Sequence, residues 1–569
     1  MQKEDRFMSP FLVMPYAAVV SLYLAFLGPL NIYIYNSEEF SSSPSELIGV
    51  LLLITGVFFF LLLALLHLPP RRFSKIFFRI IAIGVLGAWI FSTFLYGEYG
   101  RLDGTPLTIE RWGLLALAQS VVLLGLIFLS VNVSLEVIFR LVGLVFVISL
   151  ITAATNAFTL DSKEKKKAIT GLPASLTQFS PEKNVLHVVL DELGSDLFFA
   201  ALESDRELKR AFDGFTYFGN TLSVYPSTEM SIAALMTGAV YRNEESKKDF
   251  LNRLREKNIG VKRLETIGYE MDSHTTCKLG ILSHCSPANS RILKQNVADI
   301  EALELLDIFI FKSVPDFIKP NIYNHERWFF LGMHARNSYL KSHAGIAHLL
   351  FEKYLEQLTV SVDSSPRYQF FHSMVTHTPA DLDASCKILE HSEQNRLTGI
   401  EFVKCGLSHF VTLLETLKRL GIYDQTMIVL SSDHGDHWQG HQFDLKAFED
   451  LGITRRMLTR SSATLAIKPF GSRGRMVVSE APVSLRDIPA TILAAHGLEP
   501  GSESIAGVRD VFSVSEQESR EREFLYYKWE HKYWSASKLP PIVTFAVNGH
   551  LKNPEAWQSL SERGGAEGN

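Results

Sequence analysis

The chain has 569 residues, with 61 acidic and 56 basic side chains and a formal net charge of −5. A charge so close to balance excludes the extended basic surface that nucleic-acid binders need, so no nucleic-acid partner is expected. Hydrophobic residues make up 47% of the chain, and nearly all the long uncharged runs lie before residue 160, which excludes both a disordered chain and a purely soluble single domain.

Five apolar runs in the first 160 residues have roughly the 20 residues that a helix needs to cross a bilayer. In lipid each backbone N–H and C=O must be paired within its own segment, so runs of this length are expected to be helices. No Asp, Glu, Lys or Arg interrupts them, and we interpret the bundle as an anchor and not as a transporter. The predicted spans of this domain (1–160) are residues 12–34, 47–66, 80–97, 112–133 and 141–158.

Basic residues beside these runs set the expected orientation. Arg71, Arg72, Lys75 and Arg79 lie between the second and third runs, whereas the loop between the first two is acidic. The positive-inside rule then places the N-terminus in the cytoplasm and everything after residue 160 outside it. Four lysines within 163–167 oppose this locally, but a large following domain is translocated despite such charge. We expect a multi-pass protein of the inner (cytoplasmic) membrane whose main domain is periplasmic or otherwise extracytoplasmic.

After a linker (161–183), short apolar runs alternate with amphipathic stretches, as in an α/β domain with a largely parallel central sheet sandwiched by helices. The run VLHVVL (185–190) predicts a buried strand that ends at Asp191 and Glu192. Ligands of such sheets bind beyond the carboxyl ends of the strands. A carboxylate here could bind a cation, but it could equally cap the next helix.

A second predicted strand, MIVL (427–430), is followed closely by Asp433, His434 and Gly435. An Asp and a His offer oxygen and nitrogen ligands to a divalent ion, and the glycine permits the tight backbone that presents both. A purely structural turn is the alternative. Two strands are thus expected to deliver metal ligands to one edge of the sheet.

Between these strands, the segment YPSTEMSIAALMTG (225–238) predicts a turn and then a helix. Thr228 falls near the helix N-terminus, where unpaired N–H groups and the helix dipole favour an oxyanion. Coordination to a divalent cation would lower the pKa of its hydroxyl and let it attack phosphorus or sulfur. The alternative is that Thr228 or Ser227 only caps the helix.

The order and spacing of several short motifs over about 184–500 resemble the sulfatase branch of the alkaline phosphatase superfamily. With the multi-span N-terminal region, the layout is most similar to membrane-bound phosphoglycerol and phosphoethanolamine transferases of bacterial envelopes. The motifs are NVLHVVLDELG (184–194), PSTEMSIAALMTG (226–238), His377-Thr378-Pro379, Ser432-Asp433-His434-Gly435 with His441, AIKP (466–469) and SLRDIPATIL (484–493).

The resemblance implies one divalent metal ion (Mn, Zn, Mg or Ca) and a covalent intermediate on a threonine. It assigns Thr228 as nucleophile and metal ligand, and Asp191, Asp433 and His434 as further ligands. Glu192 is a weaker candidate ligand. His377 and His441 match positions that contact the transferred group or the leaving oxygen; on chemistry alone His372 is an equal candidate to His377.

Two departures from the family are informative. Thr228 stands where catalytic sulfatases have the cysteine that becomes formylglycine, so sulfate-ester hydrolysis by that route is not expected. The paired cysteines common in lipid A phosphoethanolamine transferases are missing, which puts that substrate in doubt. Four cysteines are too few for a disulfide framework or a cysteine-based zinc module, although Cys277 and Cys285 are close enough to form a bridge.

We therefore expect a catalytic domain over 184–515 and a C-terminal subdomain and tail over 516–569, whose aromatic residues either pack against the core or stack on a sugar. The leading hypothesis is a metal-dependent transferase that moves a phosphate-linked group from a phosphate-ester substrate to an envelope glycan or lipid. A sulfatase-like hydrolase or phosphodiesterase using water, or a non-catalytic envelope-assembly scaffold, are the alternatives. The sequence does not indicate an oligomeric state.

Overall fold

The computed structural model divides the chain into two compact units, residues 1–170 with 294–336 and residues 171–293 with 337–569. Each unit is described by itself below. The structure describes residues 10–560 with the exception of 37–39, 41, 100–106, 108, 161–171, 173, 276–280, 283–284, 288–297, 324–327, 335–338, 340–341, 364, 390–393, 439–441, 499–506, 530–532 and 534–535.

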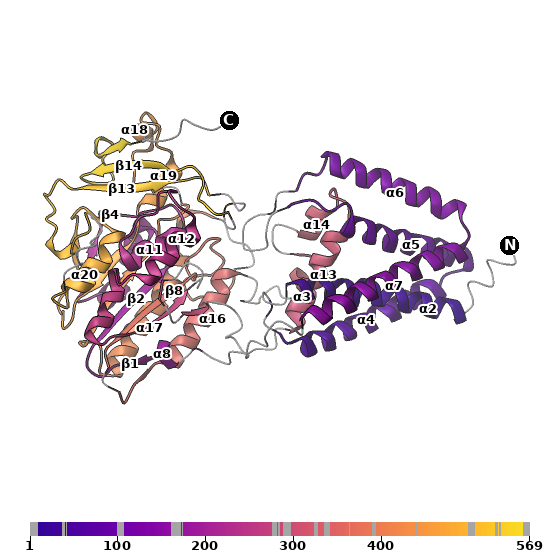
Figure 1. The fold of residues 1–569 in the computed structure, drawn as a ribbon, viewed down its shortest axis with the longest axis horizontal. Coiled ribbons are helices and arrows are strands. Elements are labelled where there is room, and N and C mark those ends of the chain that lie inside the picture. The colour runs from indigo at the N-terminus through magenta and orange to yellow at the C-terminus, as the bar shows by residue number, and fades with distance from the viewer. Residues whose placement is uncertain are drawn as a thin grey trace. The chain divides into compact units, whose positions relative to one another are not determined.

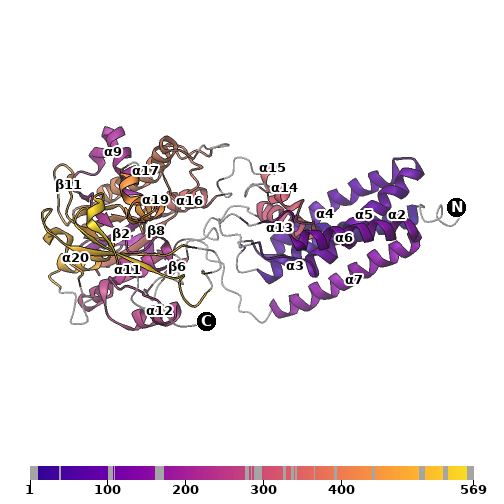
Figure 2. The same cartoon turned by 90° about the horizontal axis from the view of Figure 1, so that it is seen from above.

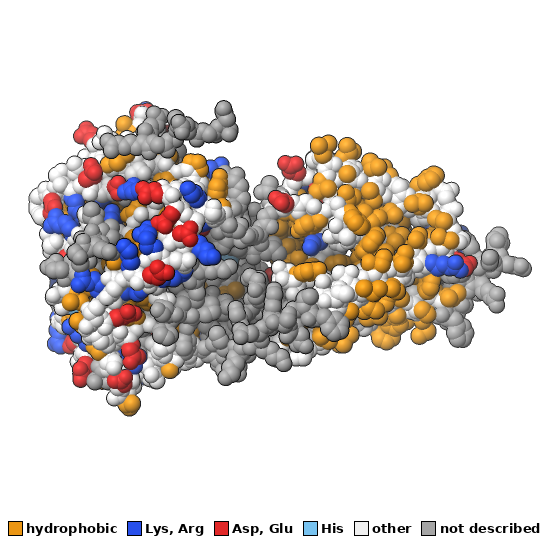
Figure 3. All heavy atoms as spheres, viewed as in Figure 1, with side chains coloured by type: hydrophobic (Ala, Val, Ile, Leu, Met, Phe, Trp, Pro, Cys, Tyr) orange, Lys and Arg blue, Asp and Glu red, His pale blue; other side chains and the backbone are white. Residues whose placement is uncertain are grey.

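The first unit is a bundle of long apolar helices (Figures 1 and 2). Within it, Tyr16 stacks on Phe78, with 3.9 Å between ring centroids, and its hydroxyl donates to the Phe78 carbonyl oxygen. Hydrophobic side chains cover much of the outer surface that Figure 3 shows for these helices, as expected of a face in contact with lipid. The helices are α2 (Pro10–Ser21), the π-helix η1 (Leu22–Leu27), α3 (Gly28–Tyr35), α4 (Pro44–His67), α5 (Arg71–Thr93), α6 (Leu114–Asn132) and α7 (Leu135–Leu160).

Six helical stretches of the described chain are long and apolar enough to cross a membrane. Five of them lie in the first unit and overlap the five predicted spans: Leu12–Tyr35, Pro44–His67, Arg72–Thr93, Leu114–Asn132 and Leu135–Asn156. The sixth, Arg396–Arg419, is helix α17 of the second unit, where its residues Phe402 and Phe410 belong to the hydrophobic core. The five helices of the first unit are long and apolar enough to anchor the chain in a membrane, and the number of crossings stays a prediction.

A segment from the middle of the chain belongs to the first unit. It carries helices α13 (Ala298–Ser313), α14 (Lys319–Tyr323) and α15 (Phe330–His334). Leu305 of α13 packs with Leu47 and Leu51 of α4, and Asp316 accepts hydrogen bonds from the Tyr99 hydroxyl (2.6 Å) and from the Gln119 amide. This division differs from the sequence-based boundaries, which placed residues 294–336 within the catalytic domain (184–515). Helix α13 contains four acidic residues, so its apolar face could not be recognised from the hydropathy of the sequence.

The second unit is built on an eight-stranded sheet with strand order β11-β3-β10-β9-β2-β8-β5-β6. Strands β9, β2, β8, β5 and β6 are parallel, whereas β10 is antiparallel to both β9 and β3. The predicted, largely parallel sheet is thereby confirmed. The strands are β2 (Asn184–Leu190), β3 (Thr216–Phe218), β5 (Glu270–Thr275), β6 (Cys285–Pro287), β8 (Arg367–Ser373), β9 (Thr426–Ser431), β10 (Leu465–Lys468) and β11 (Val477–Ser479).

Helices cover both faces of this sheet (Figure 2). Alternate residues of β2 point to opposite faces, and Val185 and Val189 belong to one hydrophobic cluster, whereas Leu186 and Val188 belong to the other. The first cluster includes α11 (Thr228–Thr237), α12 (Lys247–Glu256) and α20 (Ile488–Ala494), and the second includes α9 (Ser195–Ser204), α16 (His343–Glu356) and α17 (Arg396–Arg419). The strand is therefore buried on both sides, which explains its uninterrupted apolar sequence.

A three-stranded antiparallel sheet of β13 (Glu521–Tyr526), β14 (Val543–Asn548) and β15 (Trp557–Ser559) ends the chain. Of the aromatic residues predicted to pack or to stack on a sugar, Tyr527 is buried in the core and Trp534 lies outside the described residues. The shorter elements are α8 (Ala174–Thr177), β1 (Gln178–Phe179), α10 (Arg206–Ala211), β4 (Thr221–Leu222), η2 (Gly260–Ile267), β7 (Thr359–Val360), α18 (Leu445–Glu449), α19 (Arg455–Ser461), β12 (Val483–Ser484), η5 (Leu485–Asp487), η6 (Val511–Ser513) and η8 (Pro554–Ala556).

The described residues contain one disulfide, which the sequence analysis did not predict. Cys386 and Cys405 form a disulfide, with their Cα atoms 5.0 Å apart. Cys277, which was expected to be able to reach Cys285, lies outside the described residues. This bridge could not be predicted from the sequence because its two cysteines are 19 residues apart and are brought together by packing of a loop on α17.

Candidate metal centre and nucleophile

Two neighbouring strands bring acidic and imidazole groups to the same edge of the sheet. Asp191 follows the last residue of β2, and Asp433 and His434 follow β9. Each of the three side chains offers one ligand atom, and these atoms lie within 4.8 Å of one another. Because β2 and β9 are parallel and in register, their carboxyl ends meet, and the side chains predicted from the sequence are brought together.

Thr228 lies at the first position of α11, and its hydroxyl donates to Asp191 Oδ2 at 3.3 Å. Ser227 is the N-cap residue of the helix, but its side chain makes no capping hydrogen bond and contacts the Tyr527 hydroxyl instead. Neither hydroxyl is therefore used to cap the helix, which was the alternative interpretation of this segment. We call Asp191, Thr228, Asp433 and His434 the Asp191 group.

In each carboxylate of this group, one oxygen accepts hydrogen bonds and the other has no hydrogen-bond partner among the described residues. Asp191 Oδ2 accepts from Thr228 and His372, and Asp433 Oδ1 accepts from the backbone N–H groups of Glu192 and His434. Asp191 Oδ1 and Asp433 Oδ2 are buried and have no hydrogen-bond partner among the described residues. Buried anionic oxygens are costly unless they are paired or bind a metal, so this donor set fits a divalent cation.

The ring of His434 is oriented with one nitrogen toward these carboxylates. Its Nδ1 faces the Gly435 carbonyl oxygen at 2.8 Å and Arg460 Nη1 at 2.7 Å, so Nε2, which lies 3.2 Å from Asp433 Oδ2, is the nitrogen turned to the carboxylates. A Cβ added to Gly435 would lie 1.8 Å from the Thr459 carbonyl oxygen. Only glycine therefore permits this turn to approach α19 closely enough.

His372, the last but one residue of β8, contacts the candidate metal ligand directly. Its Nε2 lies 2.9 Å from Asp191 Oδ2, and its Nδ1 lies 3.3 Å from the Thr275 hydroxyl. Burial by itself lowers the pKa of His372, but the hydrogen bond and charge of Asp191 outweigh burial and raise it. For Asp191 burial raises the pKa, whereas the bond from His372 and the nearby imidazoles lower it to well below its ordinary value. The carboxylate is thus held ionised.

His377, which the resemblance favoured over His372, lies farther out. Its Nε2 is 4.0 Å from Glu192 Oε2, and 31% of its side chain is exposed. Among the described residues it makes no hydrogen bond or ion pair with Asp191, Asp433 or His434, whereas His372 bonds Asp191 directly. The other predicted substrate contact, His441, lies outside the described residues.

Glu192 turns away from the candidate ligands. Its backbone has a positive φ of 62°, and its carboxylate pairs with Arg460 Nη2 (2.6 Å) and His437 Nε2 (3.0 Å) and accepts from the Thr378 amide and hydroxyl. Burial raises the pKa of Glu192, but the Arg460 charge and the nearby histidines lower it, to about 2. Glu192 was the weaker candidate for a metal ligand, and its partners give it a positioning role.

Arg460, at the end of α19, was not predicted from the sequence. It is buried and contacts Glu192, His434 and His437. The residue lies in RRMLTRS, a basic helix with no recognisable motif, so only the fold reveals its position. The guanidinium offsets the carboxylates of the site and links the two loops that follow β2 and β9.

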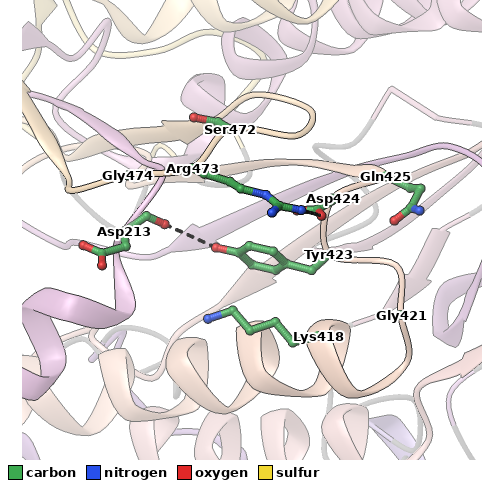
Figure 4. Close-up of a pocket in the computed structure, with 9 residues that line it drawn as sticks. All are labelled: Asp213, Lys418, Gly421, Tyr423, Asp424, Gln425, Ser472, Arg473 and Gly474. Atoms are coloured by element: carbon green, nitrogen blue, oxygen red, sulfur yellow. Dashed lines mark hydrogen bonds and ion pairs between the residues drawn. The ribbon is translucent and has the colours of Figure 1, made fainter.

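A cavity of about 420 Å³ lies elsewhere in this unit (Figure 4). Tyr423 donates to the Asp213 carbonyl oxygen across it, and Arg473 pairs with Asp424. The adjacent Gln425 directly precedes β9, so this cavity lies at the amino end of the strand and the Asp191 group lies at its carboxyl end. The cavity therefore does not belong to the candidate metal centre.

Residues 319–498 match the family model described as Sulfatase. This part of the chain is therefore similar to sulfatases. The match covers Asp433, His434 and His377, but not Asp191 or Thr228, and it confirms the resemblance drawn from the motifs. The search of curated proteins found no match.

Solved structures similar to this chain include three enzymes. The lipoteichoic acid synthase LtaP from Listeria monocytogenes is 12% identical, with 67% of this chain and 89% of that chain covered and a TM-score of 0.36. The lipooligosaccharide phosphoethanolamine transferase EptA from Neisseria meningitidis is 12% identical, with 87% and 97% covered and a TM-score of 0.35. The phosphonate monoester hydrolase from Silicibacter pomeroyi is 14% identical, with 66% and 88% covered and a TM-score of 0.36. Likeness at this level does not define the activity of the chain.

Proposed function

We propose that the protein is a membrane-anchored, metal-dependent transferase that moves a phosphate-linked group to a cell-envelope glycan or lipid through a covalent intermediate on Thr228. One observation carries this proposal: the Thr228 hydroxyl bonds to Asp191, within a group of buried ligands whose carboxylates each keep one oxygen without a hydrogen-bond partner among the described residues. The similarity to sulfatases and the apolar helices of the same chain support it.

Asp191, Asp433, His434 and Thr228 would hold one divalent ion, either Mn, Zn, Mg or Ca. When bound, such an ion lowers the pKa of a coordinated hydroxyl and neutralises the charge that develops on phosphoryl oxygens. The Thr228 hydroxyl points its proton at Asp191 Oδ2, which leaves an oxygen lone pair free for the substrate.

Transfer would then proceed in two balanced steps. The Thr228 hydroxyl gives up its proton, its oxygen attacks phosphorus to form an O–P bond, and the bond between phosphorus and the leaving oxygen breaks as that oxygen takes a proton. An acceptor hydroxyl then attacks the same phosphorus and loses its proton, and the bond between phosphorus and the Thr228 oxygen breaks as that oxygen regains a proton. His377, which is partly exposed beside Glu192, and His441 are the residues that we assign to the leaving and entering oxygens. Arg460 holds Glu192 and His434 in position throughout.

The proposed location is the inner membrane, with the catalytic unit on the extracytoplasmic side, where envelope acceptors are found. The basic residues at the start of α5, among them Arg71, Arg72 and Lys75, support a cytoplasmic side for that end of the helix. The disulfide between Cys386 and Cys405 is in keeping with an oxidising compartment.

The test is the intact mass of the full-length protein purified from membranes of its host. We expect a covalent adduct on Thr228 whose mass identifies the transferred group, and its loss in Thr228→Ala. Ser231→Ala is the matched control, because Ser231 lies one turn along the same helix and its hydroxyl bonds only the Ser227 carbonyl oxygen among the described residues. Rapid metal-dependent turnover of an aryl phosphodiester without an acceptor would instead identify a hydrolase, and a Thr228→Ala strain with an unchanged envelope would identify a scaffold.

A further inference from the structure

A second group of metal-ligand side chains lies apart from the Asp191 group. His348, Cys386, Cys405 and His409 are all buried, and each offers one ligand atom within 4.8 Å of the others. We call these four residues the Cys–His group. They come from three elements that are distant in sequence: α16, the loop after β8, and α17.

The four side chains are presented by a rigid frame. Cys405 and His409 are four residues apart on α17 and therefore lie on the same face of the helix. His348 extends from α16, and its Nδ1 lies 2.8 Å from His409 Nε2. Phe351 stacks on the His409 ring, and the ring of Tyr339 packs against His348. Both imidazoles are thus fixed by their neighbours.

Cys386 is held by a tight turn with an unusual backbone. Its φ is +59°, a conformation that is uncommon for a residue other than glycine. Its amide donates to the Asp383 carbonyl oxygen, and the Asp383 carboxylate accepts from the amides of Ser385 and Lys387. The turn places Cys386 Sγ 3.7 Å from His409 Nε2. Such backbone strain is kept where the surrounding structure requires the side chain at one place.

A disulfide alone needs no histidine beside it, yet two imidazoles are buried here. Burial lowers the pKa of His409 to about 4, helped by the charge of His348, and burial also lowers the pKa of His348. Glu352 Oε2 lies 3.7 Å from His348 Nε2, and the Glu352 side chain is half exposed.

We propose that the Cys–His group is a structural zinc site that forms when the Cys386–Cys405 disulfide is reduced. Two sulfur and two nitrogen ligands are a set that Zn²⁺ binds with tetrahedral geometry, and a Cys-x₃-His pair on one helix has the spacing common in such sites. A dithiol or phosphine reductant supplies two electrons, and with two protons the disulfide becomes two thiols. Binding of Zn²⁺ then releases those two protons and leaves two thiolates and two neutral imidazoles on the metal.

This site would stabilise the loop that carries part of the candidate active site. Only eight residues lie between His377 and Cys386, and Thr378 in the same loop bonds Glu192. The disulfide and the zinc-bound form both fasten this loop to α17. The chain would therefore keep its active-site loop in place in a reducing compartment as well as in an oxidising one.

The test uses full-length protein in detergent, reduced with a phosphine under anaerobic conditions and titrated with Co²⁺. The Asp191 group contains no sulfur, so a thiolate-to-cobalt charge-transfer band in the near ultraviolet reports on cysteine ligands, and its loss in Cys405→Ser assigns it to the Cys–His group and not to Cys277 and Cys285. We expect this band to saturate at one Co²⁺ per chain, to disappear on addition of one equivalent of Zn²⁺, and to be missing from the protein kept oxidised. Reduced wild-type protein, with its thiols confirmed by alkylation, that shows no such band would overturn the proposal.

Substitutions of single residues in the Cys–His group test which side chains bind the metal. We expect Cys405→Ser to abolish the band and His409→Ala to weaken Co²⁺ binding by at least tenfold. His496→Gln is the matched control, because His496 is a half-buried histidine bonded to Tyr269 in the other hydrophobic cluster, and it should leave the titration unchanged. A band of full strength in His348→Ala and His409→Ala would show that the histidines are not ligands.

Discussion

The Asp191 group and the Cys–His group both gather metal ligands in one unit, but they differ in chemistry and setting. The first offers carboxylate, imidazole and hydroxyl ligands at the carboxyl edge of a sheet, beside the partly exposed His377. The second offers two sulfur and two imidazole ligands that are enclosed between helices and a loop. Catalytic metal sites keep a position open for substrate, whereas structural sites are closed by four protein ligands. From this contrast we expect the Asp191 group to take part in the reaction and the Cys–His group to stabilise the fold.

The largest effect should come from the nucleophile. Thr228→Ala removes the hydroxyl that donates to the Asp191 carboxylate, and we expect transfer activity to fall by at least about 1,000-fold. Thr228→Ser keeps a hydroxyl and should retain activity within about tenfold. Initial rates at equal membrane abundance check this, and an Ala variant as active as the Ser variant would remove Thr228 from the mechanism.

Removal of the metal should have the second largest effect, and it should distinguish the Asp191 group from the Cys–His group. Dialysis against a chelator should lower activity by about 100-fold or more, and Mn²⁺ or Zn²⁺ should restore it. Asp433→Asn should prevent this restoration, because it replaces an anionic oxygen that has no hydrogen-bond partner. Cys405→Ser should leave the restoration intact. If Cys405→Ser blocks it and Asp433→Asn does not, the assignments of the two groups are reversed.

A smaller effect is expected at His372, which positions Asp191 without belonging to the ligand set. His372→Ala should weaken metal affinity and activity by about 10- to 100-fold. His372→Gln retains a side-chain donor and should recover part of both. Metal affinity measured by competition with a chromogenic chelator separates positioning from a loss of folding, which circular dichroism monitors. Unchanged metal affinity in His372→Ala would contradict the positioning role.

In oxidised protein, the Cys386→Ser/Cys405→Ser variant should change stability and not chemistry. A bridge that closes a loop of this length contributes on the order of 3 kcal/mol, so we expect a lower Tm while turnover stays within about threefold of wild type at a temperature well below it. Differential scanning fluorimetry and turnover on the same samples check this. A loss of activity as large as that of Thr228→Ala would mean that the group acts in the reaction.

The pH dependence of stability offers the smallest expected effect. Burial raises the pKa of Asp381, in the active-site loop, to about 6, opposed in part by the Ser342 hydroxyl and the His377 charge. A raised folded-state pKa contributes stability that is complete below the unfolded value near 4 and is lost as the pH rises through 6, a change of at most about 3 kcal/mol. Asp381→Asn should therefore raise Tm more at pH 7.5 than at pH 4.5. An equal shift at both pH values would contradict this assignment.

The sequence predicted those features that depend on local pattern. The apolar runs predicted long helices, and the strands ending at Asp191 and before Asp433 were placed correctly because ligands at the carboxyl ends of parallel strands converge. The sulfatase resemblance was confirmed over residues 319–498. The roles of Thr228, His377 and His441 remain predictions.

Features that depend on distant packing could not be predicted. Arg460 has no motif, and its importance arises only because α19 lies against Glu192 and His434. Helix α13 has acidic residues among its apolar ones, so its place in the first unit was not visible from hydropathy. From the sequence, a cysteine-based zinc module was excluded because the chain has only four cysteines. The two histidines that complete the Cys–His group were not considered with them, because one is 38 residues before Cys386 and the other is four after Cys405.

Anomalous diffraction from crystals grown with Mn²⁺ is the most direct test of the central claim that Asp191, Thr228, Asp433 and His434 surround one divalent ion. We expect a manganese peak at about 2.0–2.3 Å from a carboxylate oxygen of Asp191, a carboxylate oxygen of Asp433 and a ring nitrogen of His434, with the Thr228 hydroxyl facing the ion. A peak confined to other residues, or an Asp191 group that stays empty at saturating Mn²⁺, would contradict it.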